Sequence, residues 1–221
     1  MKRMILLCVC AIIGLTQAQA QLSFGVKAGA NFSTISKINY SAGGGSDDSS
    51  IDLLKPKYVP GFHIGSYLRS NFTPSIGVQA ELLYSMMGYK LSMPMVEALV
   101  KDASIKSTMH YVDVPVLFNF TVPNTGLFFE LGPQLGLFLT DKGSVSGKTD
   151  EGSLGFTAKK LGQAAKLDVS AAAGLGYRLS SGIVFSARYL YEFKTSSSDE
   201  YFIPTYAQKR CFQVSLAYEL F

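Results

Sequence analysis

Apolar and polar side chains alternate along the first stretch of the chain after residue 20. Every even position from Leu22 to Phe32 is apolar, and every odd position between them is small or polar. Successive side chains of a strand point to opposite faces, so a period of two over this length predicts one extended strand between two different environments. This pattern constrains the fold more than any other feature of the sequence.

The same alternation recurs along the chain, and each run is long enough to cross a bilayer at a tilt of roughly 45°. The eight runs are 22–32, 61–69, 76–86, 111–120, 127–137, 167–179, 183–192 and 211–220. Their apolar faces contain no Asp, Glu, Lys or Arg and are dense in Leu, Phe and Tyr. These large side chains would overfill the interior of an eight-stranded barrel, whereas lipid accommodates them. The sequence therefore predicts an all-β fold, an eight-stranded antiparallel up-and-down transmembrane β-barrel.

The connections between the runs support this prediction. Those after the second, fourth and sixth runs are short and rich in turn-forming residues, whereas residues 34–57, 88–108, 141–163 and 194–208 form long connections. Short turns at one end and long loops at the other are typical of outer-membrane barrels, with both termini on the periplasmic side. Pro115 and Pro133 each remove one ladder donor from a strand, and we interpret them as β-bulge sites.

The first twenty residues resemble a secretory signal peptide. Lys2 and Arg3 form a basic head, an apolar segment too short to span a bilayer follows, and cleavage is expected between Ala20 and Gln21. The expected division is thus a signal peptide at 1–20 and a barrel domain at 21–221. Removal of the signal lowers the formal charge from +4 to +2, which does not favour a nucleic-acid partner. It also leaves Cys211 as the one cysteine, so no intramolecular disulfide is expected.

Three segments resemble the PorT-like outer-membrane β-barrel family of Bacteroidetes-type bacteria. They are 24–32 (FGVKAGANF), 79–85 (QAELLYS) and 111–117 (YVDVPVL). The resemblance covers essentially the whole chain after the signal, and its motifs are strand patterns rather than catalytic motifs. It implies an outer-membrane barrel of largely unassigned role, in a family with some members linked to surface secretion and gliding.

Charged side chains fall on the inner faces of the predicted strands. They are Lys27, His63, Arg69, Glu81, Asp113, Glu130, Asp168, Arg178, Arg188 and Glu192. An unpaired charge inside a barrel is costly, so we expect a structural network in which these groups neutralise one another. If the second and third runs pair across the turn between them, His63 is predicted to lie opposite Glu81, or one pairing position away from it. A histidine beside a carboxylate is also half of a proton relay, which is the alternative interpretation.

The sequence offers no clear catalytic or metal site. His63 and His110 have no second His or Cys at metal-ligand spacing, and no serine lies in a nucleophile elbow. We expect no enzymatic activity and no cofactor. An enzyme would have to use acids at the outer rim, such as Asp141, Asp150 and Glu151, which are more often only solvated.

The predicted function is that of an outer-membrane scaffold that presents four extracellular loops to a protein or glycan partner. The alternatives are a small porin-like channel or a component of surface secretion. A wide pore is not expected, because porins need about 16 strands. The expected partners are outer-membrane lipid, lipopolysaccharide and the barrel-assembly machinery. Asp47 and Asp48 would hold a cation that bridges lipopolysaccharide, or belong to a solvated linker.

Overall fold

The structure is a computed structural model of the chain. It describes residues 21–35, 55–92, 101–149, 152–159, 167–194 and 208–220. The predicted signal peptide, and with it the cleavage site between Ala20 and Gln21, lies outside the described residues, as do Asp47 and Asp48. In the described ranges no helix is long and apolar enough to cross a membrane.

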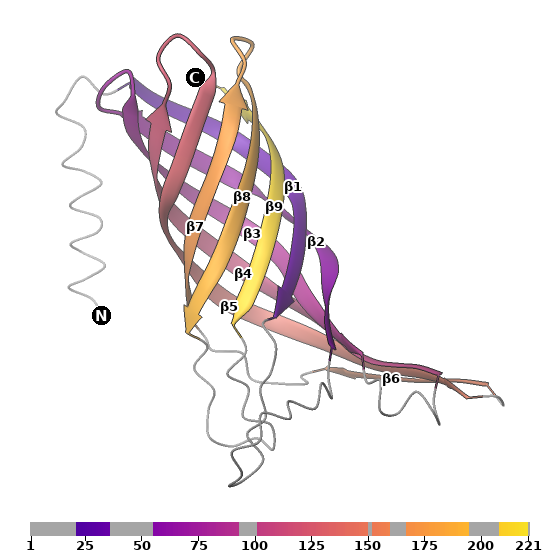
Figure 1. Cartoon of the computed structure of the whole chain (residues 1–221). Coiled ribbons are helices and arrows are strands. Elements are labelled where there is room, and N and C mark those ends of the chain that lie inside the picture. The colour runs from indigo at the N-terminus through magenta and orange to yellow at the C-terminus, as the bar shows by residue number, and fades with distance from the viewer. Residues whose placement is uncertain are drawn as a thin grey trace, which may run out of the picture.

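Eight antiparallel strands form a closed barrel (Figure 1). They are β1 (Gln21–Ile35), β2 (Lys55–Asn71), β3 (Ile76–Ser92), β4 (Lys101–Thr121), β5 (Leu127–Thr149), β7 (Leu167–Arg178), β8 (Ile183–Lys194) and β9 (Lys209–Glu219). Each strand pairs with its neighbour in the sequence, and β1 closes the ring with β9. Closure pairs the edges that an open sheet would expose to lipid. The predicted fold class is confirmed.

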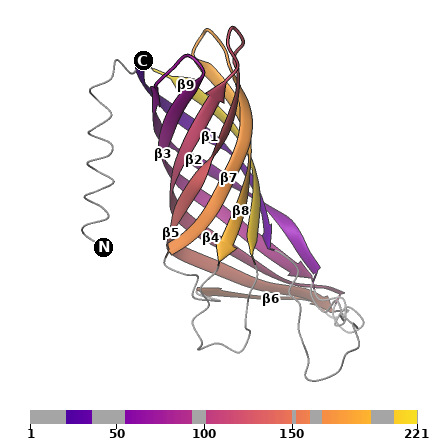
Figure 2. The same ribbon diagram turned by 60° about the vertical axis from the view of Figure 1, so that its left-hand side comes forward.

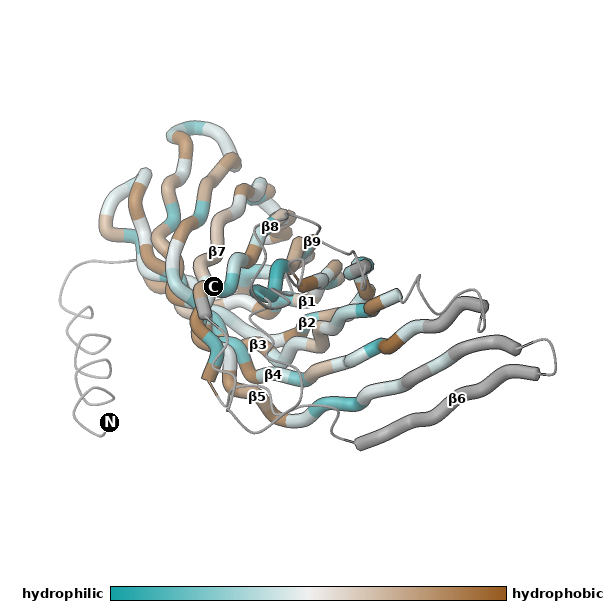
Figure 3. The backbone as a smooth tube through the Cα atoms, turned by 60° about the horizontal axis from the view of Figure 1, so that its bottom comes forward, coloured by the Kyte–Doolittle hydropathy of each residue, from teal (hydrophilic) through white to brown (hydrophobic). Residues whose placement is uncertain are grey.

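Side chains alternate between the outside and the inside of the barrel, as the sequence pattern predicts. Leu22, Leu131 and Leu216 face outward and are 54–57% exposed, whereas Asn31 and Glu130 point inward and are at most 3% exposed. Apolar and polar positions alternate along the strands of the barrel in Figure 3. The apolar faces therefore meet lipid, and the polar faces fill the interior.

Three tight turns join the strands at one end of the barrel, where β1 also begins and β9 ends (Figure 1). Two of the turns contain a residue with a left-handed backbone, Asn124 at φ 60° and Gly182 at φ 85°. Asn and Gly adopt this conformation at the lowest cost, which explains their use there. This is the predicted periplasmic end.

The strands at the opposite end are longer than the sequence pattern predicts. β3 continues to Ser92, β4 starts at Lys101, β5 extends to Thr149, and β6 (Gly152–Lys159) pairs with the end of β5. These segments form a sheet that projects beyond the barrel (Figures 1 and 2). The prediction of loops at 88–108 and 141–163 was wrong for these residues. In these segments polar side chains lie on both faces of the sheet, so apolar and polar residues do not alternate along the sequence. The ladder of main-chain hydrogen bonds forms nevertheless.

The two prolines inside strands are not bulge sites, contrary to our expectation. The β3–β4 and β4–β5 ladders skip positions around Pro115 and Pro133 and resume in the same register. The irregularities lie elsewhere, for example between Tyr58 and His63 and between His110 and Tyr111. Each proline removes only one hydrogen-bond donor, and the long strands on either side hold the register.

Candidate functional site

The centre of the barrel holds a layer of four charged side chains from four strands. Arg188 on β8 donates from Nε to Glu130 Oε1 at 2.7 Å, and from Nη1 and Nη2 to the two Glu81 oxygens at 3.0 and 2.8 Å. Lys27 Nζ on β1 contacts Glu81 Oε1 at 3.1 Å. These side chains are 0–4% exposed. Two acids and two bases neutralise one another here, and the bidentate Arg188–Glu81 pair fixes their geometry.

A layer of uncharged polar groups lies around His63. Its Nδ1 is 2.7 Å from Asn31 Oδ1, and its Nε2 is 2.9 Å from Ser215 Oγ. An amide oxygen only accepts hydrogen bonds, so Nδ1 carries the proton and Nε2 accepts from the serine hydroxyl. Gln213 Nε2 donates to the same Asn31 oxygen at 2.9 Å.

The predicted pairing of His63 with Glu81 was wrong. His63 lies opposite Ser85, and Glu81 lies opposite Tyr67. Odd positions do pair with odd positions, but β2 continues to Asn71 before the chain turns, which shifts the partners by four residues. Hydropathy predicts the face of each residue, whereas the register depends on the length of the turn.

Ser215, His63 and Asn31 are hydrogen-bonded in series, as the nucleophile, the base and the orienting amide are in a catalytic triad. Ser215 is 5% exposed, His63 1% and Asn31 0%. A substrate therefore has no access to the hydroxyl in this structure. We interpret the three residues as part of the packed interior.

Two predicted bases meet an acid that the sequence analysis did not assign to the network. Arg69 Nη2 contacts Glu219 Oε1 at 2.8 Å, and Arg178 Nε lies 3.3 Å from Glu219 Oε2. These groups lie near the periplasmic turns, beside the apolar cluster of Tyr67, Phe128, Val184 and Ala217. Glu219 occupies an inner position of β9, so its place in the alternation would have identified it.

Lys209 joins two further predicted acids near the extracellular end. Its Nζ contacts Asp168 Oδ2 at 2.8 Å, and its main-chain N–H donates to Glu192 at 2.9 Å. The ammonium also lies 3.9 Å from the centre of the Tyr111 ring. Lys209 continues the inner face of β9 two residues before Cys211, a signal that the sequence analysis missed.

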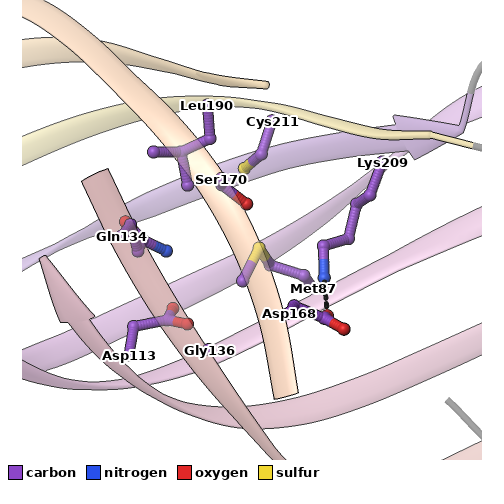
Figure 4. A pocket seen from close by; sticks show the side chains of 9 residues that line it. All are labelled: Met87, Asp113, Gln134, Gly136, Asp168, Ser170, Leu190, Lys209 and Cys211. Atoms are coloured by element: carbon purple, nitrogen blue, oxygen red, sulfur yellow. Dashed lines mark hydrogen bonds and ion pairs between the residues drawn. The ribbon is translucent and has the colours of Figure 1, made fainter. Parts of the chain in front are cut away.

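Asp113, another member of the predicted network, forms no ion pair within the described part of the chain. It lines a small cavity beside the Lys209–Asp168 pair (Figure 4). Asp113 Oδ2, Gln134 Oε1 and Asp168 Oδ1 accept no hydrogen bond from the described residues. The cavity has space for about one water molecule, and its polar lining suits water rather than an organic substrate.

Other predicted groups are also placed by the structure. Asp141, expected on a solvated rim loop, belongs to β5 and is 4% exposed. Asp150 and Glu151 lie outside the described residues. Over the ranges that the structure describes, no group of three His, Cys, Asp or Glu side chains is arranged to hold a metal ion.

The closed ring with a lipid-facing exterior and a polar interior defines an outer-membrane β-barrel protein. Residues 17–197 match the family described as outer membrane protein beta-barrel domain, and the chain belongs to this family. The protein is therefore located in the outer membrane. No curated protein matches the sequence.

Among solved structures, the chain is similar to several small barrels. Ail, the attachment invasion locus protein of Yersinia pestis, in complex with the heparin analogue sucrose octasulfate, shares 16% identity over 90% of this chain and 99% of that chain, with a TM-score of 0.43. Neisserial surface protein A shares 12% sequence identity over 88% of this chain and 96% of that chain, with a TM-score of 0.45. OprG from Pseudomonas aeruginosa shares 13% sequence identity over 92% of this chain and 99% of that chain, with a TM-score of 0.42.

Proposed function

We propose that the protein is a non-enzymatic outer-membrane scaffold that presents its extracellular connections and projecting sheet to a protein or glycan partner. The central charged layer carries this proposal. Arg188, Glu81, Glu130 and Lys27 come from four strands, contact one another at 2.7–3.1 Å and are at most 4% exposed. An interior filled in this way supports an anchor rather than a path for solutes.

The energetics of the layer also favour a closed lumen. A conducting pathway would require Arg188 to leave three charge-assisted hydrogen bonds. It would then leave Glu130 without its arginine inside the barrel, where an uncompensated charge costs several kcal/mol. A small channel, the second candidate, therefore requires a rearrangement of the interior.

The projecting sheet supports a role outside the membrane. β3, β4, β5 and β6 continue their hydrogen-bonded ladder beyond the barrel (Figure 2). The paired strands of this sheet lie outside the ring, at the end opposite the tight turns. This is the arrangement expected of a protein that contacts partners there.

The finer assignments belong to the same proposal. They are removal of a signal peptide between Ala20 and Gln21, insertion by the barrel-assembly machinery and membership of the PorT-like subfamily. A part in surface secretion would follow the last of these. The three sequence segments that resemble the PorT-like subfamily support the proposed membership.

Conductance of the full chain in a planar bilayer tests the scaffold against the channel. We expect no stable single-channel openings from the wild type. The quadruple variant Lys27→Ala/Glu81→Ala/Glu130→Ala/Arg188→Ala removes all four members of the central layer, so that none of them is left as an unpaired buried charge, and it should conduct. Stable openings of the wild type would overturn the scaffold proposal in favour of the channel.

A fluorophosphonate probe, which labels activated serines, tests the absence of catalysis at Ser215. We expect no labelling of the folded protein, because the hydroxyl is buried. Labelling that disappears in Ser215→Ala, while the barrel still shows heat-modifiable migration on a gel, would contradict the non-enzymatic proposal.

A further inference from the structure

Lysines lie side by side on neighbouring strands where the projecting sheet leaves the barrel. Lys57 on β2 pairs with Lys90 on β3, and Lys90 pairs with Lys106 on β4. Lys142 on β5 pairs with Thr108, two residues from Lys106, and so lies diagonal to it. We call these four lysines the lysine row. Three of them are exposed and Lys90 is half-buried.

The lysine row points to the outer side of the sheet, in continuity with the lipid-facing surface of the barrel. Lys106 is an even number of residues from the outward-facing Val116 and Phe118 on the same strand. Directly paired side chains share a face, so Lys90 and Lys57 point the same way. The register shifts account for the change of the outward positions from even to odd on β2 and from odd to even on β5.

The acidic side chains lie on the opposite side of the sheet from the lysine row, where Lys27, Arg69, Arg178, Arg188 and Lys209 contact several of them. Every acidic side chain that the structure describes lies on the inner side: Glu81, Asp113, Glu130, Asp141, Asp168, Glu192 and Glu219. None of the lysine row forms an ion pair with a described residue. Like charges directly opposite one another destabilise a sheet, so this surface favours an external anion.

The height of the lysine row indicates where that anion lies. Lys90 follows Met86, the last apolar outward residue of β3, by four residues. At about 3.3 Å per residue and a tilt near 45°, it lies about 9 Å above the apolar band. Tyr84 and His110 mark the edge of this band, with ring centroids 5.9 Å apart and a 2.6 Å hydrogen bond between them. The row is therefore at the level of lipid head groups, within reach of the flexible lysine stems.

We propose that the lysine row binds the phosphate groups of lipopolysaccharide in the outer leaflet. The apolar surface below the row contacts acyl chains, and the phosphates on the sugars of the same molecules lie directly above them. Lys57, Lys90 and Lys106, on three adjacent strands of the row, span about 10 Å, enough to engage more than one phosphate. Clustered lysines beside a membrane bind anionic head groups as point charges on mobile stems. The inference is independent of whether the lumen conducts.

Native mass spectrometry of the full chain in detergent, titrated with bis-phosphorylated lipid A, tests the proposal. The variant Lys90→Gln/Lys106→Gln removes the centre of the row. The matched control Lys101→Gln/Lys148→Gln removes another directly paired couple on the same sheet, farther from the barrel. We expect binding to weaken roughly 10- to 30-fold in the first variant and less than twofold in the control.

Three further measurements separate this ligand from other anions. Dephosphorylated lipid A should bind the wild type as weakly as the phosphorylated form binds Lys90→Gln/Lys106→Gln. A chelator of divalent cations should leave binding unchanged, because lysines contact phosphate directly. Dissolved heparin should compete poorly, because it lacks the acyl chains.

The proposal is overturned by any of four results. These are equal losses in the two double variants, equal binding of dephosphorylated lipid A, loss of binding on chelation, or tighter binding of heparin than of lipid A. Heat-modifiable migration on a gel confirms that each variant is folded.

Discussion

Replacement of Arg188 by methionine tests the central charged layer most directly. The arginine makes three charge-assisted hydrogen bonds of 2.7–3.0 Å to two carboxylates. Without it Glu81 keeps Lys27 at 3.1 Å, whereas Glu130 loses the cation that contacts it. Both carboxylates are at most 1% exposed, so water cannot replace the guanidinium. Removal of one partner from a buried ion pair costs about 3–5 kcal/mol, and we expect Arg188→Met to destabilise the barrel by this amount.

The assay is equilibrium urea unfolding in lipid vesicles, followed by far-ultraviolet circular dichroism and by gel mobility. The matched control is Arg178→Met, because its partner Glu219 is partly exposed and retains Arg69. We expect the control to cost less than about 1 kcal/mol. Adding Glu130→Gln to Arg188→Met should recover part of the loss, because it removes the uncompensated charge. Equal losses in Arg188→Met and Arg178→Met would refute the reasoning.

Three other predictions concern the lipid face, the strand spacing and the interior. Leu131→Lys places a charge at the middle of the lipid-facing surface and should cost about 2–4 kcal/mol in the same unfolding assay, whereas Leu179→Lys near the periplasmic turn should cost about 0–1 kcal/mol. Gly132→Ala should prevent assembly, judged by heat-modifiable migration, because its Cβ would collide with a main-chain carbonyl of β4. Gly136→Ala should assemble, because the nearest atom to its Cβ is the side-chain carboxylate oxygen of Asp113 at 2.9 Å, which can shift without moving the main chain. Cys211 is 1% exposed, so its thiol should resist maleimide in the folded barrel. If the signal peptide is removed, the denatured protein purified from outer membranes should take up one equivalent of maleimide rather than three. Rapid labelling of the folded protein, or assembly of Gly132→Ala, would contradict these expectations.

The alternation of side chains predicted much of what the structure contains. It placed Glu81, Glu130 and Arg188 inside the barrel and Leu22 outside, because a strand in lipid admits only one orientation of its polar face. It could not predict which charges meet. Lys27 and Arg188 are 161 positions apart in the chain, and both contact Glu81 only because the ring closes.

Partners that the sequence analysis missed illustrate the same limit. Lys209 and Glu219 lie on the inner face of β9, yet their acid and base partners come from strands that are distant in the sequence. His63 was assigned to the wrong partner because the turn before β3 sets the register, and hydropathy does not report the register.

The sequence by itself determined the fold class and the face of each strand residue, because lipid on one side and a packed interior on the other impose a period of two on the chain. Only the tertiary structure decided the register, the contacts of the central layer and the extent of the projecting sheet. In the projecting part of the sheet polar side chains occupy positions on both faces, so the ladder of main-chain hydrogen bonds continues without a hydropathy signal. That ladder also aligns Lys57, Lys90 and Lys106, which are far apart in the sequence, into one surface.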